Sequence, residues 1–319
     1  MSISFPAPDL VDTNGIRMAA HQQGRGPPVI LLHGFPELAF SWRHQLPALA
    51  AAGYRAIAPD QRGYGATDKP GGVADYTIQK LISDITGLLD ALELERAVFV
   101  GHDWGALVLW QMALLAPERM AGLVNLTIPF FARRPTDPIS LMRDFLGDDF
   151  YIVNFQDSNE ADLKCDADPG RVFDVLMRTG QEPRGRLETL PKDRRVFSLL
   201  KALARKELRG EPLLNQEEHR VFTEAFKAGG FRGPINWYRN WSHNWSSTEG
   251  VEQTVNVPTL FIGAQDDILV LPAHIEAMKP HVPDLEIHMI GDCGHWTQQE
   301  KPEAVNELIL AWLARRYPV

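Results

Sequence analysis

Short apolar runs alternate along the chain with segments in which apolar residues recur every three or four positions. The runs PPVILLHGF (27–35) and YRAIAPD (54–60) are closed by Gly or Pro, which is typical of buried strands in a mostly parallel sheet. Residues 77–94 place a continuous apolar stripe on one helical face, and this stripe predicts an amphipathic helix. The stripe consists of Ile78, Leu81, Ile82, Ile85, Leu88, Leu89 and Leu92.

The alternation continues through the next segments and is then interrupted. A strand over AVFV (97–100), a helix from residue 104 and a strand-like run over 122–130 form a βαβ pattern. From residue 132 onward, stretches rich in Pro, Gly and charged residues interrupt helix-like pieces. We therefore expect residues 132–245 to form an inserted, largely helical cap domain.

The alternation resumes after this insert. Strands over 258–264 and 285–291 and a closing amphipathic helix over 302–317 extend the earlier pattern. We therefore expect an α/β core domain made of residues 1–131 and 246–319, with a mostly parallel central sheet flanked by helices.

Composition narrows the class of protein. The 319 residues are 45% hydrophobic and 23% charged, as in ordinary globular proteins. The formal net charge of -9 argues against a nucleic-acid partner, which needs clustered Lys and Arg. Only Cys165 and Cys293 occur, without metal or redox spacing. No secretory signal or membrane-spanning run is evident, so we expect a cytoplasmic protein with no membrane partner.

The segment GHDWG (101–105) carries the first candidate for chemistry. A strand ends at this point and a helix begins, which is where the hydrolase pattern G-x-S-x-G places a nucleophilic serine. Asp103 takes the place of that serine. A carboxylate is already ionised at neutral pH, so Asp103 is the candidate nucleophile, although an Asp that only caps the helix would also fit. The flanking glycines favour the catalytic interpretation.

A histidine and a second acid follow in the chain order typical of such hydrolases. His295 lies in a Gly-bounded turn after the last strand and is the candidate base that activates water. His102 is the rival base. Asp267 is the preferred acid to orient His295, with Asp266 as its rival, because the other place for such an acid offers only Asn125.

The segment HGFPE (33–37) is expected to complete the site. The backbone N–H groups of Phe35 and Trp104 are candidates for an oxyanion hole around the Asp103 carbonyl. Pro36 shapes the turn, and Glu37 is a weaker candidate for positioning water.

Five segments taken together carry a family resemblance: HGFPE, DQRGYGATDKP, GHDWG, FRGPINWYRNW and DCGHWTQQEKP. With them, the chain resembles the soluble epoxide hydrolases of the α/β-hydrolase superfamily over nearly its whole length. The resemblance implies an α/β-hydrolase fold with a lid, no cofactor or metal, a small-molecule epoxide as substrate, and leaves a homodimer open. Two lid tyrosines of that family donate hydrogen bonds to the epoxide oxygen, and Tyr151 and Tyr238 match their positions. Trp237 is a weaker candidate for the substrate site.

The resemblance implies a two-step reaction. Asp103 attacks an epoxide carbon to form a covalent ester, and water activated by His295 and Asp267 hydrolyses the ester to a vicinal diol. A haloalkane dehalogenase with the same Asp nucleophile is the alternative, although a halide leaving group needs no phenolic donor. A non-catalytic ligand-binding protein on a hydrolase scaffold is the alternative of another class. The tryptophans at 237, 241 and 245 recur every four residues and predict a helical packing stripe.

Overall fold

The computed structural model describes residues 5–179 and 196–319. The chain divides into two compact units. We call the first the α/β unit, and it comprises Met1–Asp68, Ile78–Ala132 and Val251–Val319. We call the second the helical unit, and it comprises Lys69–Thr77 and Arg133–Gly250. The sequence pattern did not suggest that residues 69–77 would group with the helical insert.

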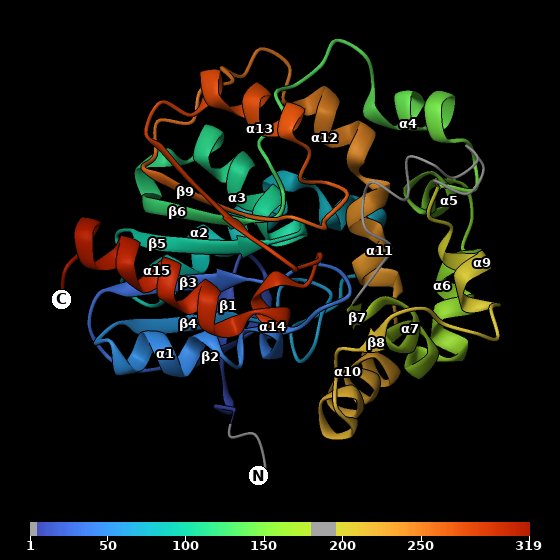
Figure 1. Ribbon diagram of the computed structural model, residues 1–319, viewed down its shortest axis with the longest axis horizontal. Coiled ribbons are helices and arrows are strands. Elements are labelled where there is room, and N and C mark those ends of the chain that lie inside the picture. Colours follow the sequence, from blue (N-terminus) through green and yellow to red (C-terminus); the bar gives the residue numbers. More distant parts are fainter. Residues whose placement is uncertain (1–4, 180–195) are drawn as a thin grey trace. The chain divides into compact units, whose positions relative to one another are not determined.

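A single mixed sheet forms the centre of the α/β unit (Figure 1). Within the described ranges it has eight strands in the order β1-β2-β4-β3-β5-β6-β9-β10. The pairs from β4 through β10 are parallel, whereas β1 and β2 join the edge in antiparallel register. The strand bounds are β1 Pro8–Thr13, β2 Ile16–Gln23, β3 Pro28–Leu32, β4 Arg55–Pro59, β5 Ala97–His102, β6 Met120–Leu126, β9 Thr259–Ala264 and β10 Leu285–Ile290.

The strand order places a switch point beside β3. The chain leaves β3 for β4 on one side and returns to β5 on the other. In open α/β sheets, ligands bind at the carboxyl ends of strands at such a reversal. HGFPE lies in the loop that follows β3, and GHDWG spans the carboxyl end of β5 and the turn after it, so the fold brings these two segments to the same place.

The hairpin of β1 and β2 is an element that we did not anticipate. Asn14 and Gly15 form its turn, and both have positive φ, at 43° and 76°. Asn-Gly is the favoured pair for a two-residue hairpin turn of this handedness. The pair in DTNG was therefore the available signal for this hairpin.

Helices cover both faces of the sheet (Figure 1). Helices α1 (Gln45–Ala51) and α15 (Pro302–Arg316) pack on one face with alternate residues of the strands, such as Val29 and Leu31. Helices α2 (Ile78–Ala91) and α3 (Trp104–Leu115) pack against each other on the opposite face. The shorter elements are η1 Ala39–Trp42, η3 Pro117–Arg119, α13 Pro272–Met278, η5 Lys279–His281 and α14 Thr297–Glu300.

The helical unit is built from short helices around an aromatic core that includes Phe173, Phe226 and Phe231. Polar caps start several of its helices, and Asn215 and Glu218 form a reciprocal capping box on α10. Its elements are η2 Val73–Tyr76, α4 Pro138–Leu146, α5 Tyr151–Asp157, α6 Glu160–Ala167, α7 Pro169–Leu176, β7 Arg178–Thr179, α9 Leu199–Leu203, β8 Glu211–Pro212, α10 Gln216–Gly229, α11 Arg232–Arg239 and α12 Trp241–Ser247.

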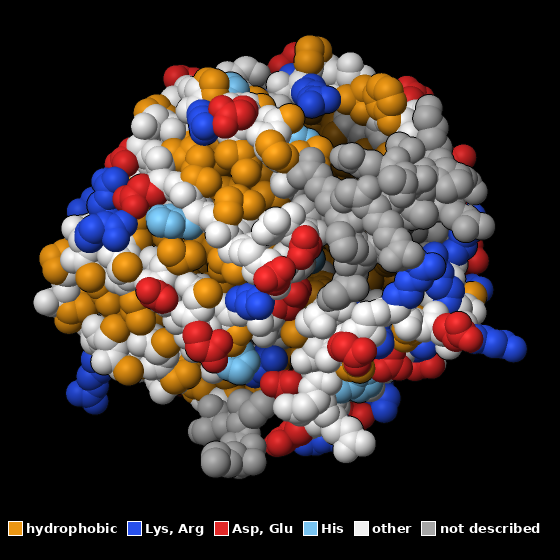
Figure 2. All heavy atoms as spheres, in the orientation of Figure 1, with side chains coloured by type: hydrophobic (Ala, Val, Ile, Leu, Met, Phe, Trp, Pro, Cys, Tyr) orange, Lys and Arg blue, Asp and Glu red, His pale blue; other side chains and the backbone are white. Residues whose placement is uncertain are grey.

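Surface charge is mixed over the described residues. Figure 2 shows Lys and Arg side chains interspersed with Asp and Glu on the face that it presents. None of the helices in the described part of the chain has both the length and the apolar character needed to cross a membrane.

Candidate active site

Asp103 stands at the apex of a sharp turn between β5 and α3. Its backbone has φ 51° and ψ -119°, a left-handed conformation that costs energy for any residue other than Gly. Two glycines allow the surrounding backbone to come close. A Cβ on Gly34 would lie 2.4 Å from the Asp103 side chain, and a Cβ on Gly105 would lie 2.0 Å from the Leu32 carbonyl oxygen. The turn therefore has the strained geometry of a nucleophile elbow.

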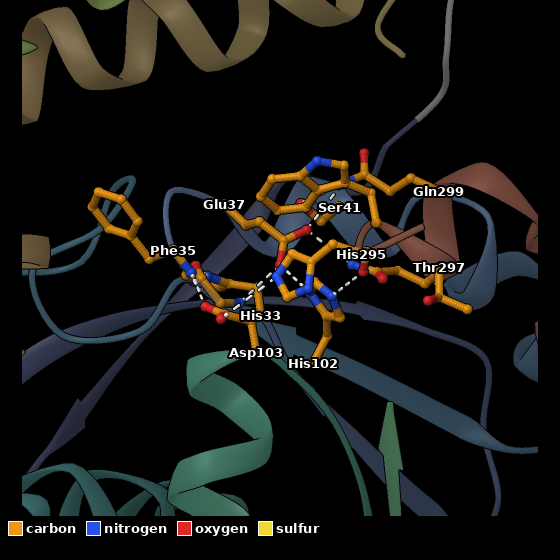
Figure 3. Close-up of polar contacts among 12 residues, drawn as sticks. His33, Phe35, Glu37, Ser41, His102, Asp103, His295, Thr297 and Gln299 are labelled. Atoms are coloured by element: carbon orange, nitrogen blue, oxygen red, sulfur yellow. Dashed lines mark hydrogen bonds and ion pairs between the residues drawn. The ribbon is translucent and has the colours of Figure 1, made fainter. Parts of the chain in front are cut away.

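His295 lies beside this carboxylate, in the loop that follows β10 (Figure 3). Its Nε2 is 3.6 Å from Asp103 Oδ2, and its Nδ1 is 2.7 Å from Asp267 Oδ2. The loop after β9 supplies Asp267, which is 3% exposed and also accepts a hydrogen bond from Leu269 N–H. The structure thus brings Asp103, His295 and Asp267 together, and it is Asp267 rather than Asp266 that contacts the imidazole.

The charges of these neighbouring side chains shift the pKa values of Asp103 and His295 in opposite directions. Burial alone would raise the pKa of Asp103, but the contact with His295 and the N–H of Phe35 hold it below its usual range. Burial alone would lower the pKa of His295, but the negative charges of Asp267 and Asp103 raise it well above its usual range. The site therefore favours a carboxylate beside an imidazolium before any reaction occurs.

The oxyanion-hole candidates lie next to the same carboxylate. Phe35 N–H donates a hydrogen bond of 2.8 Å to Asp103 Oδ1 (Figure 3). Trp104 is the first residue of α3, where backbone N–H groups point out of the helix N-terminus. Pro36 is buried and follows a cis peptide bond. The two oxygens of Asp103 therefore have different surroundings, with Oδ1 at a backbone donor and Oδ2 toward the imidazole.

Glu37 is fully buried and heavily hydrogen-bonded. Its Oε2 accepts from Gly34 N–H and contacts His102 Nδ1, at 2.9 Å and 2.7 Å. Its Oε1 accepts from the side-chain amides of Gln298 and Gln299, at 2.8 Å and 2.9 Å. A carboxylate offers about four acceptor positions, and these contacts use them. The geometry favours a role in holding the HGFPE loop over direct contact with a water molecule.

The charge environment of Glu37 matches this role. Burial alone would raise the pKa of its carboxyl, but the contacts with His102 and with the Gly34 N–H lower it below its usual range. Glu37 is therefore an ionised group at neutral pH, buried and paired.

His102, the rival base, has both ring nitrogens engaged. Nδ1 contacts Glu37, and Nε2 lies 2.7 Å from the backbone oxygen of His295. The ring thus links the HGFPE loop to the loop that carries His295. An imidazole held at both ends is poorly placed to take a proton from water.

The sequence reasoning missed a second group that holds the His295 loop. Glu300 accepts hydrogen bonds from Gly294 N–H and Trp296 N–H, at 2.9 Å and 3.0 Å, so one carboxylate ties down both neighbours of His295. The polar run TQQE directly after HW was the only signal, and it resembles an ordinary solvated helix start.

Tyr151 and Tyr238 lie together within the helical unit. Tyr151 is the first residue of α5, and Tyr238 is the penultimate residue of α11. Their ring centroids are 5.8 Å apart with an interplanar angle of 72°, and the Phe155 ring packs against both. Tyr238 is 2% exposed.

The tryptophan stripe is not a single helical face. Trp237 is buried on α11, but that helix ends at Arg239 and a new helix, α12, begins at Trp241. The expectation of one continuous stripe was therefore wrong, because the chain turns at Asn240.

Comparisons with known proteins agree with the fold. A family profile described as the alpha/beta hydrolase fold matches residues 27–165. Epoxide hydrolase A of Mycobacterium tuberculosis is 40% identical, with 97% of each chain covered. Bifunctional epoxide hydrolase 2 of Mus musculus is 35% identical over 94% of this chain, which spans about half (54%) of that longer protein.

Solved structures of epoxide hydrolases are also similar to this chain in fold. The crystal structure of Epoxide Hydrolase A from Mycobacterium thermoresistibile has a TM-score of 0.85 and 36% identity, covering 97% of this chain and 98% of that chain. Epoxide hydrolase I of potato (Solanum tuberosum) has a TM-score of 0.83 and 30% identity, with 97% and 99% covered.

Proposed function

Because this chain belongs to the epoxide hydrolase family of α/β-hydrolase fold, we propose that it hydrolyses small-molecule epoxides to vicinal diols through a covalent ester on Asp103. The reaction uses amino-acid side chains and water, and the substrate is the only partner it requires. The cytoplasm is the compartment we propose, since the two cysteines are both free and buried.

In the first step, Asp103 Oδ2 attacks one ring carbon of the epoxide. A bond forms between that carbon and Oδ2, and the bond from the carbon to the ring oxygen breaks. Tyr151 and Tyr238 donate hydrogen bonds to the ring oxygen, and one phenol transfers its proton to the alkoxide as it forms. Solvent then returns a proton to that tyrosine.

In the second step, water attacks the Asp103 carbonyl carbon. Esterification removes the negative charge of Asp103, and this charge was one cause of the raised pKa of His295. His295 therefore loses its proton to solvent more readily in the ester than in the free enzyme, and the neutral ring accepts a proton from water while Asp267 stabilises the imidazolium. Phe35 N–H stabilises the negative charge on Oδ1, and collapse of the intermediate releases the diol.

The observation that carries this proposal is the pair of contacts on Asp103. The backbone donor meets one oxygen, and the imidazole, itself backed by Asp267, lies at the other. A carboxylate that merely capped α3 would not need a histidine–aspartate pair beside it, and Asp103 makes no side-chain cap on that helix.

A single turnover in heavy-oxygen water tests the proposal. We expect the label to enter the Asp103 carboxyl group, detected by mass spectrometry of the peptide that spans the elbow, because solvent attacks the protein carbonyl. The proposal is overturned if the label enters only the diol.

The variant His295→Gln supplies the matching trap. It should form the ester at a near-normal rate and then hydrolyse it on the order of 10⁴-fold more slowly, so that an adduct accumulates and is seen by intact mass. Asp266→Asn is the matched control and should accumulate none. Alkyl halides offered to the same preparations distinguish a dehalogenase, which would release halide faster than it opens epoxides.

A further inference from the structure

The two tyrosine-bearing helices are short. Helix α5 has seven residues and α11 has eight. Helices of this length are not stable by themselves, so their positions depend on the contacts that they make. The mutual placement of Tyr151 and Tyr238 must therefore come from whatever joins α5 to α11.

Arg239, the residue after Tyr238, makes the most extensive of these contacts. An arginine side chain has five N–H donors in a fixed planar fork, and each of them has an acceptor here. The Nε donor reaches Phe155 O at 2.9 Å, Nη1 reaches Asn236 Oδ1 at 2.9 Å and Asp162 Oδ2 at 3.1 Å, and Nη2 reaches Ser158 O at 2.9 Å and Asp162 Oδ1 at 2.8 Å.

These acceptors lie on or at the end of two consecutive helices, α5 and α6, and on α11 itself. The carbonyls of Phe155 and Ser158 are at the C-terminus of α5, where backbone oxygens lack partners within the helix and a positive charge is favourable. Asp162 is on α6, and its side chain is 6% exposed, against 9% for that of Arg239. One buried guanidinium thus fixes the end of α5 and the start of α6 against α11.

Gln156 provides a second, smaller bridge. Its Nε2 donates to Tyr238 O at 2.9 Å and to Ile152 O at 2.9 Å. Arg239 holds the backbone carbonyl of Phe155, and the side-chain ring of the same residue packs against both tyrosines. The contacts that join the two helices therefore lie next to Tyr238 on α11 and between one and two helical turns after Tyr151 on α5.

We propose that Arg239 is the positioning residue that sets the geometry of the Tyr151–Tyr238 pair for donation to the epoxide oxygen. The inference rests on the proposed function, because it assigns Arg239 a role only through the two phenols. A lysine keeps the charge beside Asp162 but has three donors on a single atom, so it cannot hold two carbonyls, the carboxylate and the Asn236 amide together.

Arg239→Lys tests this in pre-steady-state measurements of ester formation. We expect the rate constant for ester formation to fall by about 100-fold, the loss associated with misplacing a reacting group by about 1 Å. The burst amplitude per mole of folded protein should stay unchanged, and so should the rate of ester hydrolysis, which uses only residues of the α/β unit. A purely structural role would lower the amplitude and leave the rate constant of the remaining active molecules unaltered, and that result overturns the proposal.

Arg143→Lys is the matched control. Arg143 also pairs with an aspartate at the end of α5, because its Nη2 donates to both carboxylate oxygens of Asp157, at 3.0 Å and 2.8 Å. That pair is in solvent, with side chains 38% and 57% exposed. Exposed ion pairs contribute little, so the control should keep a wild-type rate of ester formation.

Gln156→Met provides an independent arm if the arginine variant folds poorly. It removes one bridge without exposing a buried charge, and we expect a several-fold slower ester formation at full amplitude.

The Tyr151→Phe and Tyr238→Phe variants distinguish a failure of the positioning role of Arg239 from a failure of the proposed function. If they slow ester formation while Arg239→Lys and Gln156→Met do not, the positioning role is wrong and the proposed function stands. If the tyrosine variants react at the wild-type rate, the role of the phenols in the proposed function is wrong.

Discussion

The α/β unit and the helical unit hold their candidate reactive groups by different means. In the α/β unit, Asp103 is fixed by the backbone itself, at a positive φ between a strand end and a helix start, with Gly34 packed against its side chain. In the helical unit, Tyr151 and Tyr238 lie on short helices whose positions depend on side chains such as Arg239. The first arrangement is encoded in a few adjacent residues, and the second is distributed over distant ones.

This difference predicts unequal consequences when the reactive groups themselves are removed. Asp103→Ala should lower turnover on the order of 10⁶-fold, the size of effect seen when a nucleophile that acts with its partners is removed. Changing both tyrosines to Phe should lower the rate of ester formation by about 10²- to 10⁴-fold, because a proton donor is lost while the nucleophile remains. Steady-state diol production and single-turnover ester formation measure the two effects.

The opposite order of effects would mean that the helical unit, rather than the α/β unit, holds the more important reactive groups. If Asp103→Ala keeps measurable diol formation while the double tyrosine variant is inactive, water attacks the epoxide directly and the helical unit carries the essential chemistry. Tyr317→Phe is a suitable control for the tyrosine changes, since its hydroxyl bonds to Ala121 O near the start of β6, at the opposite end of the parallel strands from Asp103.

The same contrast explains what could be predicted from the sequence. The strand–turn–helix pattern at GHDWG and the chain order of acid and histidine predicted a group of Asp103, Asp267 and His295, and the structure places these three side chains together because local geometry and strand order determine their positions. The amphipathic patterns located α2 and α15, with ends shifted by a few residues, and the strand–turn–helix order located α3. These features depend on neighbours in the chain.

The rest depends on contacts that a sequence pattern does not encode. Glu300 accepts hydrogen bonds from Gly294 and Trp296, which are near it in the chain, but TQQE has the composition of an ordinary solvated helix start and gives no sign of these bonds. Arg239 was part of a motif used for Tyr238, yet its contacts lie about eighty positions away along the chain. The roles of Tyr151 and Tyr238 came from a family resemblance and remain predictions.

A backbone-encoded site should be sensitive to the smallest added side chain. In Gly34→Ala the new Cβ would lie 2.4 Å from the Asp103 side chain, so the loop must move or the variant must unfold more easily. We expect a loss of about 1–3 kcal/mol in the free energy of unfolding, typical of overpacking, together with loss of activity. Urea unfolding and diol formation measure the two effects.

Gly71→Ala is the control for that change, because nothing lies within 4 Å of a Cβ built at Gly71. This variant should unfold at a urea concentration close to that of the unmodified protein. Equal stability of the Gly34 and Gly71 variants would show that the loop yields easily and that the elbow is less rigid than its contacts indicate.

The smallest effect that we predict is the pH dependence of the charges around His295. The folded-state pKa of His295 is raised, after burial is offset by Asp267 and Asp103. Its charge therefore contributes stability that is fully present below the unfolded-state pKa of about 6.5, and this contribution is lost as the pH rises through the higher folded-state value. The stability difference between the unmodified protein and His295→Gln should accordingly shrink from acidic to alkaline pH in urea titrations. A His295→Gln difference that grows with pH would mean that the imidazole is neutral in the folded enzyme, and ester formation would then not be needed to lower its pKa.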